Sequence, residues 1–287
     1  TTLFRSDLDL DKVYSKLDRN YSSLGEASLY SMLRNPLNDE KKLNKRREEI
    51  EYFKENEEVR FKIMWIFFEL GRDKKNSLLD MINEKLIESN KFKYYFYTIT
   101  GKILPLILIL TAIFVSVSAM LGLMAVTFLN IYINSKERDR IKANGLMYLR
   151  RVIKASKQIV KINDKNLESF NIKIRENLKD LKSIDRNTIM ISFINMWGGV
   201  FEFISVLFLL EETAYYKIAD SIEKNKDSIL SLYKTLGEME AIISIGSYEE
   251  EKKDKITRPK FIRETTLEIK NGIHPIIENP VRSEERR

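Results

Sequence analysis

The chain has 287 residues, of which 32% are charged and 44% hydrophobic, and its formal net charge is +7. This composition excludes a disordered chain, and the length accommodates one large or two small domains. Cysteine is absent and there is one histidine, which excludes disulfides, thiolate chemistry and a histidine-based metal cluster. Ten glycines and five prolines indicate long helices with few loops.

Residues 1–90 are predicted to form the N-terminal part of a helical core. Residues 7–34 predict two short helices, the first capped by Asp7 or Asp9 and the second ending before Pro36. Residues 38–40 are expected to cap the next helix, and apolar residues at helical spacing then continue to Leu70. Trp65 lies within this stripe, and we expect it to pack in the core.

An uncharged run of thirty-three residues, 103–135, interrupts the charged chain. Apolar runs of about 18 residues or more are typical of membrane segments. Basic residues flank the run on both sides, which favours two ends on one side of a bilayer. We therefore predict an apolar helical hairpin, or re-entrant helix pair, over residues 91–140, with its turn near residues 116–122. The alternatives are a single span and a buried core or oligomer helix. The side chains expected to contact lipid are Ile103, Leu110, Phe114, Leu121, Phe128 and Ile133.

The segment from Lys136 to Arg186 is strongly basic, with 15 Lys and Arg against 7 Asp and Glu. A basic helix beside an apolar segment suits an anionic membrane leaflet, and it also suits the phosphates of DNA. The third interpretation is a solvated helix face with compensating carboxylates nearby. The side chains predicted to contact phosphate or anionic lipid are Lys136, Arg138, Arg140, Lys142, Arg150, Arg151 and Lys154.

Residues 141–247 are predicted to form further long helices, with a loop at 163–166. A second apolar stretch, 188–210, is interpreted as a core helix broken at its glycines rather than a second span. Glu202 is its only charge; with no partner recognisable in the sequence, we expect an exposed edge or an internal hydrogen bond. Residues 211–247 predict one long amphipathic helix.

Residues 248–287 begin with a charged linker. Residues 265–269 alternate as a strand does, and Asn271-Gly272 predicts a turn. His274 is the lone histidine and has no recognisable nucleophile or metal partner, so we expect it to brace this turn with Pro275 rather than to act in catalysis.

Two segments of the chain resemble the MutS family of DNA mismatch-repair ATPases. The segment 17–60 is similar to the entry into the family's core domain, and the segment 232–248 to the helix that returns from its lever to the core. The segment 267–281 is similar to the strand that opens the family's ATPase domain. The residues that carry the first and last matches are Leu17, Asp18, Arg19, Gly25, Leu29, Leu33, Pro36, Leu37, Arg46, Ile50, Gly272, His274, Pro275 and Glu278.

The resemblance implies an all-α fold of long core and lever helices with a small C-terminal β element. The uncharged run takes the place of the family's DNA-contacting clamp, as in a bacterial MutS-like subgroup with predicted membrane segments. The pattern G-x-x-x-x-G-K-[ST] is absent from the sequence, so we expect no ATP hydrolysis by this chain itself. ATP and Mg²⁺ are expected only for the missing ATPase domain, through which the family forms homodimers, and no small-molecule substrate is implied.

The expectation is a non-catalytic core and lever module that couples an ATPase domain to a membrane or DNA-contacting end. The alternatives are a DNA-backbone-binding module that uses residues 136–186, and a membrane-anchored helical scaffold unrelated to repair. The expected location is the cytoplasmic side of the cell membrane, or the cytoplasm if the hairpin is buried in protein.

Overall fold

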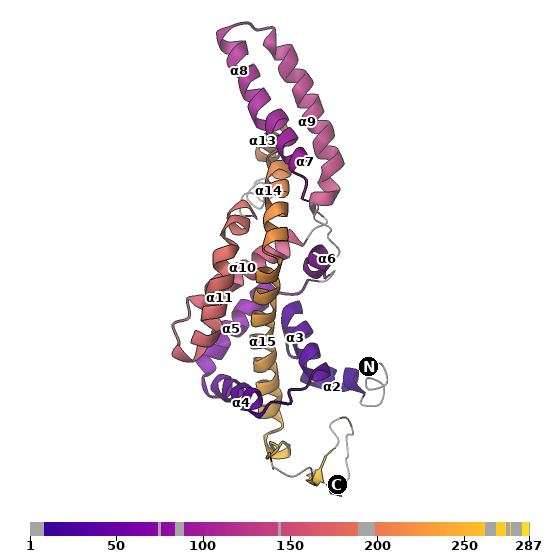
Figure 1. Ribbon diagram of the computed structural model, residues 1–287, viewed down its shortest axis with the longest axis vertical. Helices are drawn as coiled ribbons and strands as arrows, with labels where there is room; N and C mark the ends of the chain where they lie inside the picture. The colour runs from indigo at the N-terminus through magenta and orange to yellow at the C-terminus, as the bar shows by residue number, and fades with distance from the viewer. Residues whose placement is uncertain are drawn as a thin grey trace. The chain divides into compact units, whose positions relative to one another are not determined.

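The computed structural model describes residues 9–73, 76–83, 89–142, 145–188, 199–261, 268–273, 276 and 283–286 (Figure 1). Helices make up most of this part of the chain, and two short strands lie near the C-terminus. The predicted all-α class with a small C-terminal β element is therefore confirmed.

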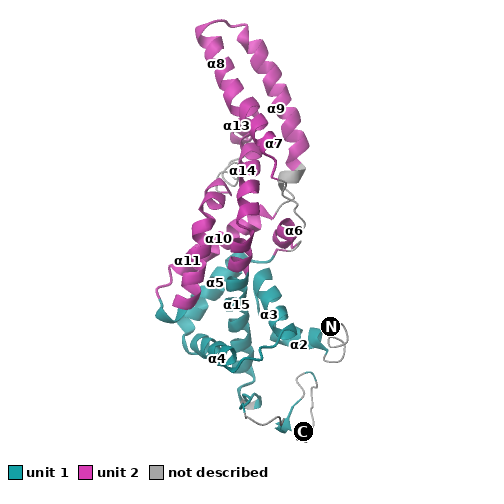
Figure 2. Ribbon diagram, viewed as in Figure 1, with its two compact units in different colours: residues 1–72, 164–167, 234–287 teal, residues 73–163, 168–233 magenta. Residues whose placement is uncertain are grey.

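The chain forms two compact units, which Figure 2 colours separately. Unit 1 consists of residues 1–72, 164–167 and 234–287, and unit 2 of residues 73–163 and 168–233. The hairpin packs at its base against helices far downstream, so it belongs to the same unit as they do. Residues 226–233 of the long helix α15 belong to unit 2, and the rest of the helix belongs to unit 1.

Unit 1 contains the N-terminal helices and the larger part of α15. Its elements are α2 (Leu10–Leu17), α3 (Ser23–Arg34), α4 (Glu40–Glu55), α5 (Glu57–Leu70), η2 (Lys165–Leu167), α15 (Lys226–Glu251), η3 (Lys253–Lys255), β1 (Glu268–Gly272) and β2 (Ser283–Arg286). The two helices predicted within residues 7–34 are confirmed, as is the cap of α4, where Asp39 accepts from the amide of Lys42 at 3.1 Å. Asp9 precedes α2 in a left-handed conformation and makes no side-chain cap.

Helices α3 and α15 pack closely because each presents a glycine to the other. A Cβ on Gly237 would lie 2.3 Å from the carbonyl oxygen of Leu24, and a Cβ on Gly25 would lie 2.2 Å from Glu240 Oε2. Leu24 and Leu29 of α3 are fully buried, as are Phe67 of α5 and several residues of α15. Glycine is therefore required where the two helices approach.

Unit 2 contains the hairpin and the helices around its base. Its elements are α6 (Ser77–Asn83), α7 (Lys91–Thr98), the π-helical turn η1 (Ile99–Ile103), α8 (Leu104–Phe114), α9 (Ala119–Lys142), α10 (Leu146–Val160), α11 (Glu168–Asp180), α13 (Val200–Phe208) and α14 (Leu210–Lys224). The predicted hairpin is present: α7, η1 and α8 run continuously as the first leg, and α9 is the second. Its turn lies at residues 115–118, within which the hydroxyls of Ser116 and Ser118 are 2.8 Å apart.

Three sequence predictions are wrong in detail. The helix expected over residues 211–247 breaks at Asn225, whose Nδ2 donates to Ser221 O at 2.8 Å and caps the end of α14. Trp65 is 54% exposed, because the core face of α5 is formed by Ile63, Ile66 and Phe67 and the tryptophan lies on the other side. Asn271 and Gly272 end strand β1 instead of forming a turn; an irregularity in the β1–β2 pairing lies just before Gly272, and Asn271 has a positive φ of 56°.

The loop predicted at residues 163–166 is confirmed between α10 and α11. Gly199, with a φ of 59°, precedes α13, in agreement with a break at the glycines. Residues 189–198 of the second apolar stretch lie outside the described residues, as do His274 and Pro275.

Candidate functional site

The hairpin exposes apolar side chains along both of its legs. Five of the six side chains predicted to contact lipid, namely Ile103, Leu110, Phe114, Leu121 and Phe128, are between 47% and 79% exposed. Ile133 is the exception at 7% exposure, because it lies at the base, where α9 packs against α13 and α14. Val115 and Val117 in the turn are 79% and 70% exposed, so the apolar surface continues over the tip.

The first leg, Lys91–Phe114, meets the length and composition expected of a helix that crosses a membrane. It is the one helix that does so among the described residues. Only 22% of its most apolar part is buried. A core helix of a soluble protein would be mostly buried, so this helix departs from that pattern.

Two threonine hydroxyls on the apolar part of the legs are bonded within their own helices. Thr111 donates to the carbonyl oxygen of Ile107 at 2.7 Å, and Thr127 donates to that of Leu123 at 2.8 Å. A polar group that is already bonded costs less to remove from water than a free one. The threonines are therefore compatible with an apolar environment around the hairpin.

A buried asparagine joins the two legs at the base of the hairpin. In η1 the amide of Leu104 donates to Ile99 O, five residues back, and leaves the carbonyl of Thr100 available. Asn130 of α9, which is fully buried, donates to Thr100 O at 3.1 Å and to Leu207 O of α13 at 2.7 Å. One side chain therefore connects three segments of unit 2.

Gly101 allows the end of α13 to approach the first leg. A Cβ at this position would lie 2.5 Å from Phe208 O and 2.8 Å from Leu209 Cβ. The backbone atom cannot move away without shifting the helix, so the contact requires glycine. Leu209, with a φ of 47°, then turns the chain into α14.

One turn along α9, Asn134 donates to Glu212 Oε1 of α14 at 2.7 Å. Glu212 is fully buried, and its Oε2 has no hydrogen-bond partner within the described part of the chain. Burial raises the pKa of Glu212 to about 7, against the lowering effect of its hydrogen bonds. This carboxyl group therefore changes its protonation near neutral pH.

A third polar residue of α9, Glu137, ties the first leg to α14. Its carboxylate is 2.8 Å from Lys93 Nζ and accepts from the hydroxyls of Tyr97 and Tyr216 at 2.9 and 2.8 Å. The carboxylate is buried, so the lysine and the two phenols replace the water it would otherwise bind.

Asn130, Asn134 and Glu137 form the polar face of α9, with spacings of four and three residues that place them on one side of the helix. None of the three is among the site residues predicted from the sequence. The sequence does show three polar residues at helical spacing where the uncharged run ends, and this pattern could have identified the polar face. Their partners Leu207, Glu212 and Tyr216 lie 77 to 79 residues away, so the sequence does not show which residues they pair with.

The predicted phosphate or lipid contacts fall on two different helices. Lys136 and Arg138 are exposed near the end of α9, where Lys136 lies over the ring of Tyr132 at 5.9 Å. Arg150, Arg151 and Lys154 lie on α10, and the side chains of Arg140 and Lys142 are outside the described residues. Arg138 forms an ion pair of 2.9 Å with Glu202 of α13, so the glutamate lies on the expected exposed edge but does have a basic partner.

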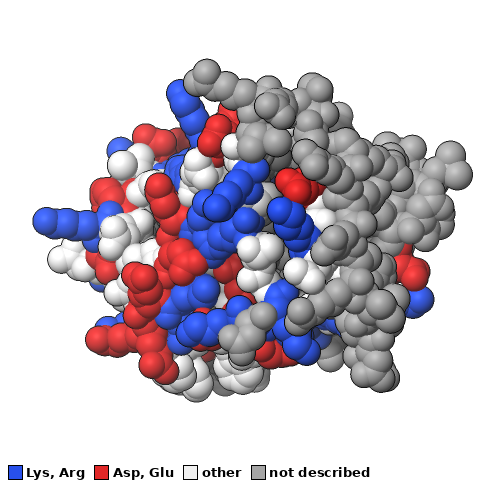
Figure 3. Space-filling view, turned by 90° about the horizontal axis from the view of Figure 1, so that it is seen from below, with Lys and Arg blue, Asp and Glu red and all other residues white. Residues whose placement is uncertain are grey.

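Charge of both signs covers the described part of the face shown in Figure 3, where acidic and basic side chains lie next to one another. Within unit 1, Lys54 and Arg258 both lie close to Glu249, and Arg258 also contacts Glu51. The basic segment 136–186 contains ion pairs of its own, Lys157 with Asp185 and Arg175 with Glu168.

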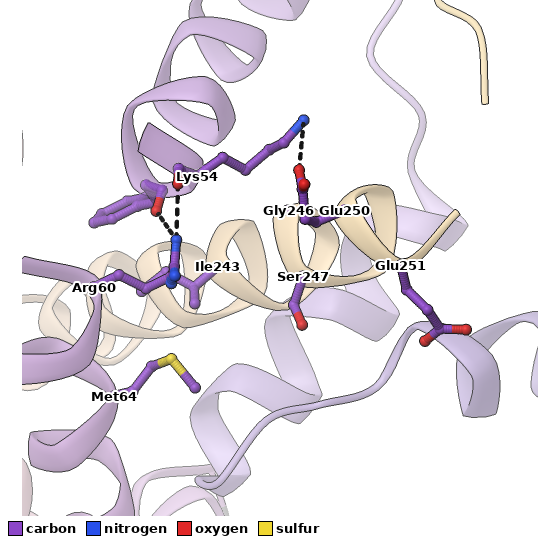
Figure 4. Close-up of a pocket in the computed structure, with 9 residues that line it drawn as sticks. Lys54, Arg60, Met64, Ile243, Gly246, Ser247, Glu250 and Glu251 are labelled. Atoms are coloured by element: carbon purple, nitrogen blue, oxygen red, sulfur yellow. Dashed lines mark hydrogen bonds and ion pairs between the residues drawn. The ribbon is translucent and has the colours of Figure 1, made fainter. Parts of the chain in front are cut away.

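Unit 1 contains a pocket of about 460 Å³ between α4, α5 and α15 (Figure 4). Arg60 in its wall donates to the carbonyls of Phe53 and Lys54 at 2.7 and 2.9 Å, which caps the end of α4. Lys54 lies 3.9 Å from Glu250 across the pocket. Its charged groups thus already have partners in the protein, and the described residues contain no group of acidic or histidine side chains suited to a metal ion.

The family-motif residues that the structure describes lie in the helical framework of unit 1. Gly25 is buried against Glu240, whose carboxylate accepts from the amides of Tyr21 and Ser22 at 2.6 and 3.1 Å and from the Ser22 hydroxyl. Burial raises the pKa of Glu240 to about 7, against the lowering effect of these donors. Pro36 lies exposed between α3 and α4, and Arg46 is half-buried on α4.

Comparison with known protein families, with characterised proteins and with solved structures finds no match to this chain.

Proposed function

We propose that this chain is a membrane-anchored helical protein whose apolar hairpin enters a lipid bilayer and holds its helical units at the membrane surface. The observation that carries the proposal is the exposure of an uncharged hairpin along both legs and over its tip. Soluble proteins seldom expose a continuous apolar surface of this kind.

The distribution of the exposed side chains favours lipid over a protein partner. Large apolar side chains are exposed on both legs and in the turn between them: Leu110 of α8, Val117 of the turn and Phe128 of α9 are 47%, 70% and 73% exposed. A docked protein would cover one side of the hairpin, whereas hydrocarbon surrounds it. Each large apolar side chain transferred from water contributes about 1.5–3 kcal/mol when fully buried, so the tip and legs together favour insertion strongly.

The charges at the base indicate which surface the hairpin enters. Lys102 and Lys136 are exposed where the apolar legs end. Basic residues beside an inserted segment are attracted to anionic headgroups, which are concentrated in the cytoplasmic leaflet. We therefore propose that the units lie on the cytoplasmic side of the cell membrane.

Flotation with phospholipid vesicles tests the proposal. Val115→Asp combined with Val117→Asp places two charges on the exposed tip, where they do not disturb packing, and each charge costs about 3 kcal/mol near the centre of a bilayer. Phe61→Asp combined with Ile172→Asp is the matched control, because both of these side chains are exposed outside the hairpin. The unaltered chain and the control should float, and the tip variant should remain in the soluble fraction. Flotation of all three, or of none, would refute the anchor.

A second proposal follows from the resemblance to MutS proteins, namely that the anchored module is coupled to an ATPase domain. It is supported by a contact between the two resembling segments 17–60 and 232–248: the Leu17 carbonyl accepts from Ser244 Oγ at 2.7 Å, and Arg19 donates to Ser247 O at 2.7 Å. The test is the coding sequence that follows Arg287. An open frame with a phosphate-binding loop supports coupling, and a stop codon in an intact gene would remove it.

A further inference from the structure

We propose that the hairpin is re-entrant, entering the hydrocarbon from one side of the bilayer and ending inside it, and that the exposed apolar face of α13 lies in the headgroup layer beside the base of the hairpin. This inference rests on the proposed membrane anchor. It specifies the depth of the contact and adds a second contact surface to it.

The apolar legs are too short to cross the hydrocarbon. Thirteen residues separate Lys102 from the end of α8 at Phe114, counting both, which is about 20 Å of helix. The second leg matches this reach, because Asn130 bonds to Thr100 and Gly122 lies opposite Leu108. The hydrocarbon of a bilayer is about 30 Å thick, so the tip ends inside it.

The base of the hairpin cannot sink further to make up the difference. Lys93 and Glu137 are paired there, with Tyr97 and Tyr216 bonded to the same carboxylate, and α7 packs along α14. Insertion of these residues would carry an ion pair and the flanking helix α14 into hydrocarbon. The full length of the Lys91–Phe114 helix is therefore not available for crossing, although its length alone is sufficient.

Helix α13 presents a second apolar surface beside the base of the hairpin. Phe201, Phe203 and Ile204 are 41%, 62% and 37% exposed. The helix packs against α9 and η1, and its carbonyl at Leu207 is bonded to Asn130, which is also bonded to Thr100. At the other end of α13, Glu202 pairs with Arg138, which lies eight residues beyond Asn130 on α9, so the exposed apolar face lies beside the base of the hairpin, on the side of Asn130 away from the tip.

The absence of cysteine makes the depth directly measurable, because single cysteines can be introduced without other changes. Val117→Cys reports the tip, Phe203→Cys reports α13, and Ile172→Cys on α11 is the exposed control. Each variant is bound to phosphatidylcholine and phosphatidylglycerol vesicles. One sample carries a fluorophore on the cysteine and lipids with a quencher at a known acyl depth, and another is exposed to a membrane-impermeant maleimide trapped inside the vesicles.

We expect the tip label to be quenched by deep quenchers and to escape the trapped maleimide. The α13 label should be quenched by shallow quenchers, and the α11 label by none. Reaction of the tip cysteine with the trapped maleimide in floating vesicles would overturn the re-entrant depth while leaving the anchor in place. An α13 label that behaves like the α11 control would overturn the second contact. Failure of every variant to float would instead refute the anchor itself, and this inference with it.

Discussion

Asn130 donates to the carbonyl of Leu207 at 2.7 Å and thereby joins the second leg of the hairpin to the end of α13. The same amide group also bonds to Thr100 O, which the π-helical turn leaves available. A single side chain at the end of an uncharged run therefore fixes where the hairpin meets the rest of its unit. The apolar part beyond this point makes few contacts except between its own two legs.

The first prediction concerns this asparagine. Asn130→Ala should lower the free energy of unfolding by about 2–4 kcal/mol, because two buried hydrogen bonds are lost and two carbonyls remain without a donor. Chemical unfolding of the detergent-solubilised protein measures the change. Asn166→Ala is the control at an exposed position and should alter the free energy by no more than about 0.5 kcal/mol. Equal effects of the two substitutions would contradict the connecting role of Asn130.

The second prediction compares two glycines of the hairpin. Gly101→Ala should destabilise the protein by more than about 2 kcal/mol, because the new methyl group would lie 2.5 Å from a backbone oxygen of α13. Gly122→Ala should be close to neutral, because its nearest neighbour is the end of the Leu108 side chain at 3.2 Å, which can rotate. Thermal unfolding in the same detergent distinguishes them. A neutral Gly101→Ala would show that α13 does not pack on η1 as described.

The third prediction is a pH dependence that arises from Glu212. Its pKa is raised from 4.5 to about 7 by burial, so the folded protein holds this proton more tightly than the unfolded chain does. The stabilisation is fully present below pH 4.5 and is lost as the pH rises through 7, by up to about 3 kcal/mol. Glu240, whose pKa is also raised to about 7, contributes with the same sign.

Glu212→Gln should remove its share of this slope and stabilise the protein at pH 8, because the amide carries no charge and retains an acceptor for Asn134. Urea unfolding at several pH values between 4.5 and 8 measures the slope. Glu223→Gln, at an exposed position of the same helix, should leave it unchanged. If the free energy of unfolding of the unaltered protein instead rose between pH 4.5 and 8, Glu212 would not be buried in an environment that disfavours its carboxylate.

The fourth prediction concerns the basic edge of the hairpin. Lys136→Ala should weaken binding to anionic vesicles about fivefold, because a basic residue near such a surface contributes about 1 kcal/mol. Lys41→Ala makes the same change of charge at an exposed site on α4 and should have little effect. Sedimentation binding at low and high salt measures both. An equal loss for the two variants would mean that net charge alone, and not position, determines binding.

The sequence was sufficient for the features that depend on local pattern. The uncharged run, its basic flanks and the polar residues near its middle predicted the hairpin and its turn, and Asp39 predicted a helix cap. It was insufficient where a distant partner decides the outcome. Glu202 has a basic partner in Arg138, 64 residues earlier, and the polar face of α9 depends on partners 77 to 79 residues later.

The errors within single helices have a different cause. Trp65 was assigned to the core by its neighbours in sequence, but its direction around α5 places it outside. Asn225 interrupts a run of apolar spacing that is otherwise continuous, because its side chain bonds to the preceding helical turn. A periodicity pattern averages over many positions, so it does not detect a single residue that points outward or interrupts a helix.

The most direct test of the account is the location of the chain in cells, compared with a variant that lacks only the apolar tip. Replacement of residues Leu108–Gly122 by a short Gly/Ser linker keeps the Asn130 bonds at the base, because Leu108 and Gly122 lie opposite each other. Cells are fractionated and the membranes washed with alkaline carbonate. We expect the unaltered chain to stay in the washed membranes and the shortened variant to be soluble and helical. An unaltered chain found in the soluble fraction would contradict the membrane anchor.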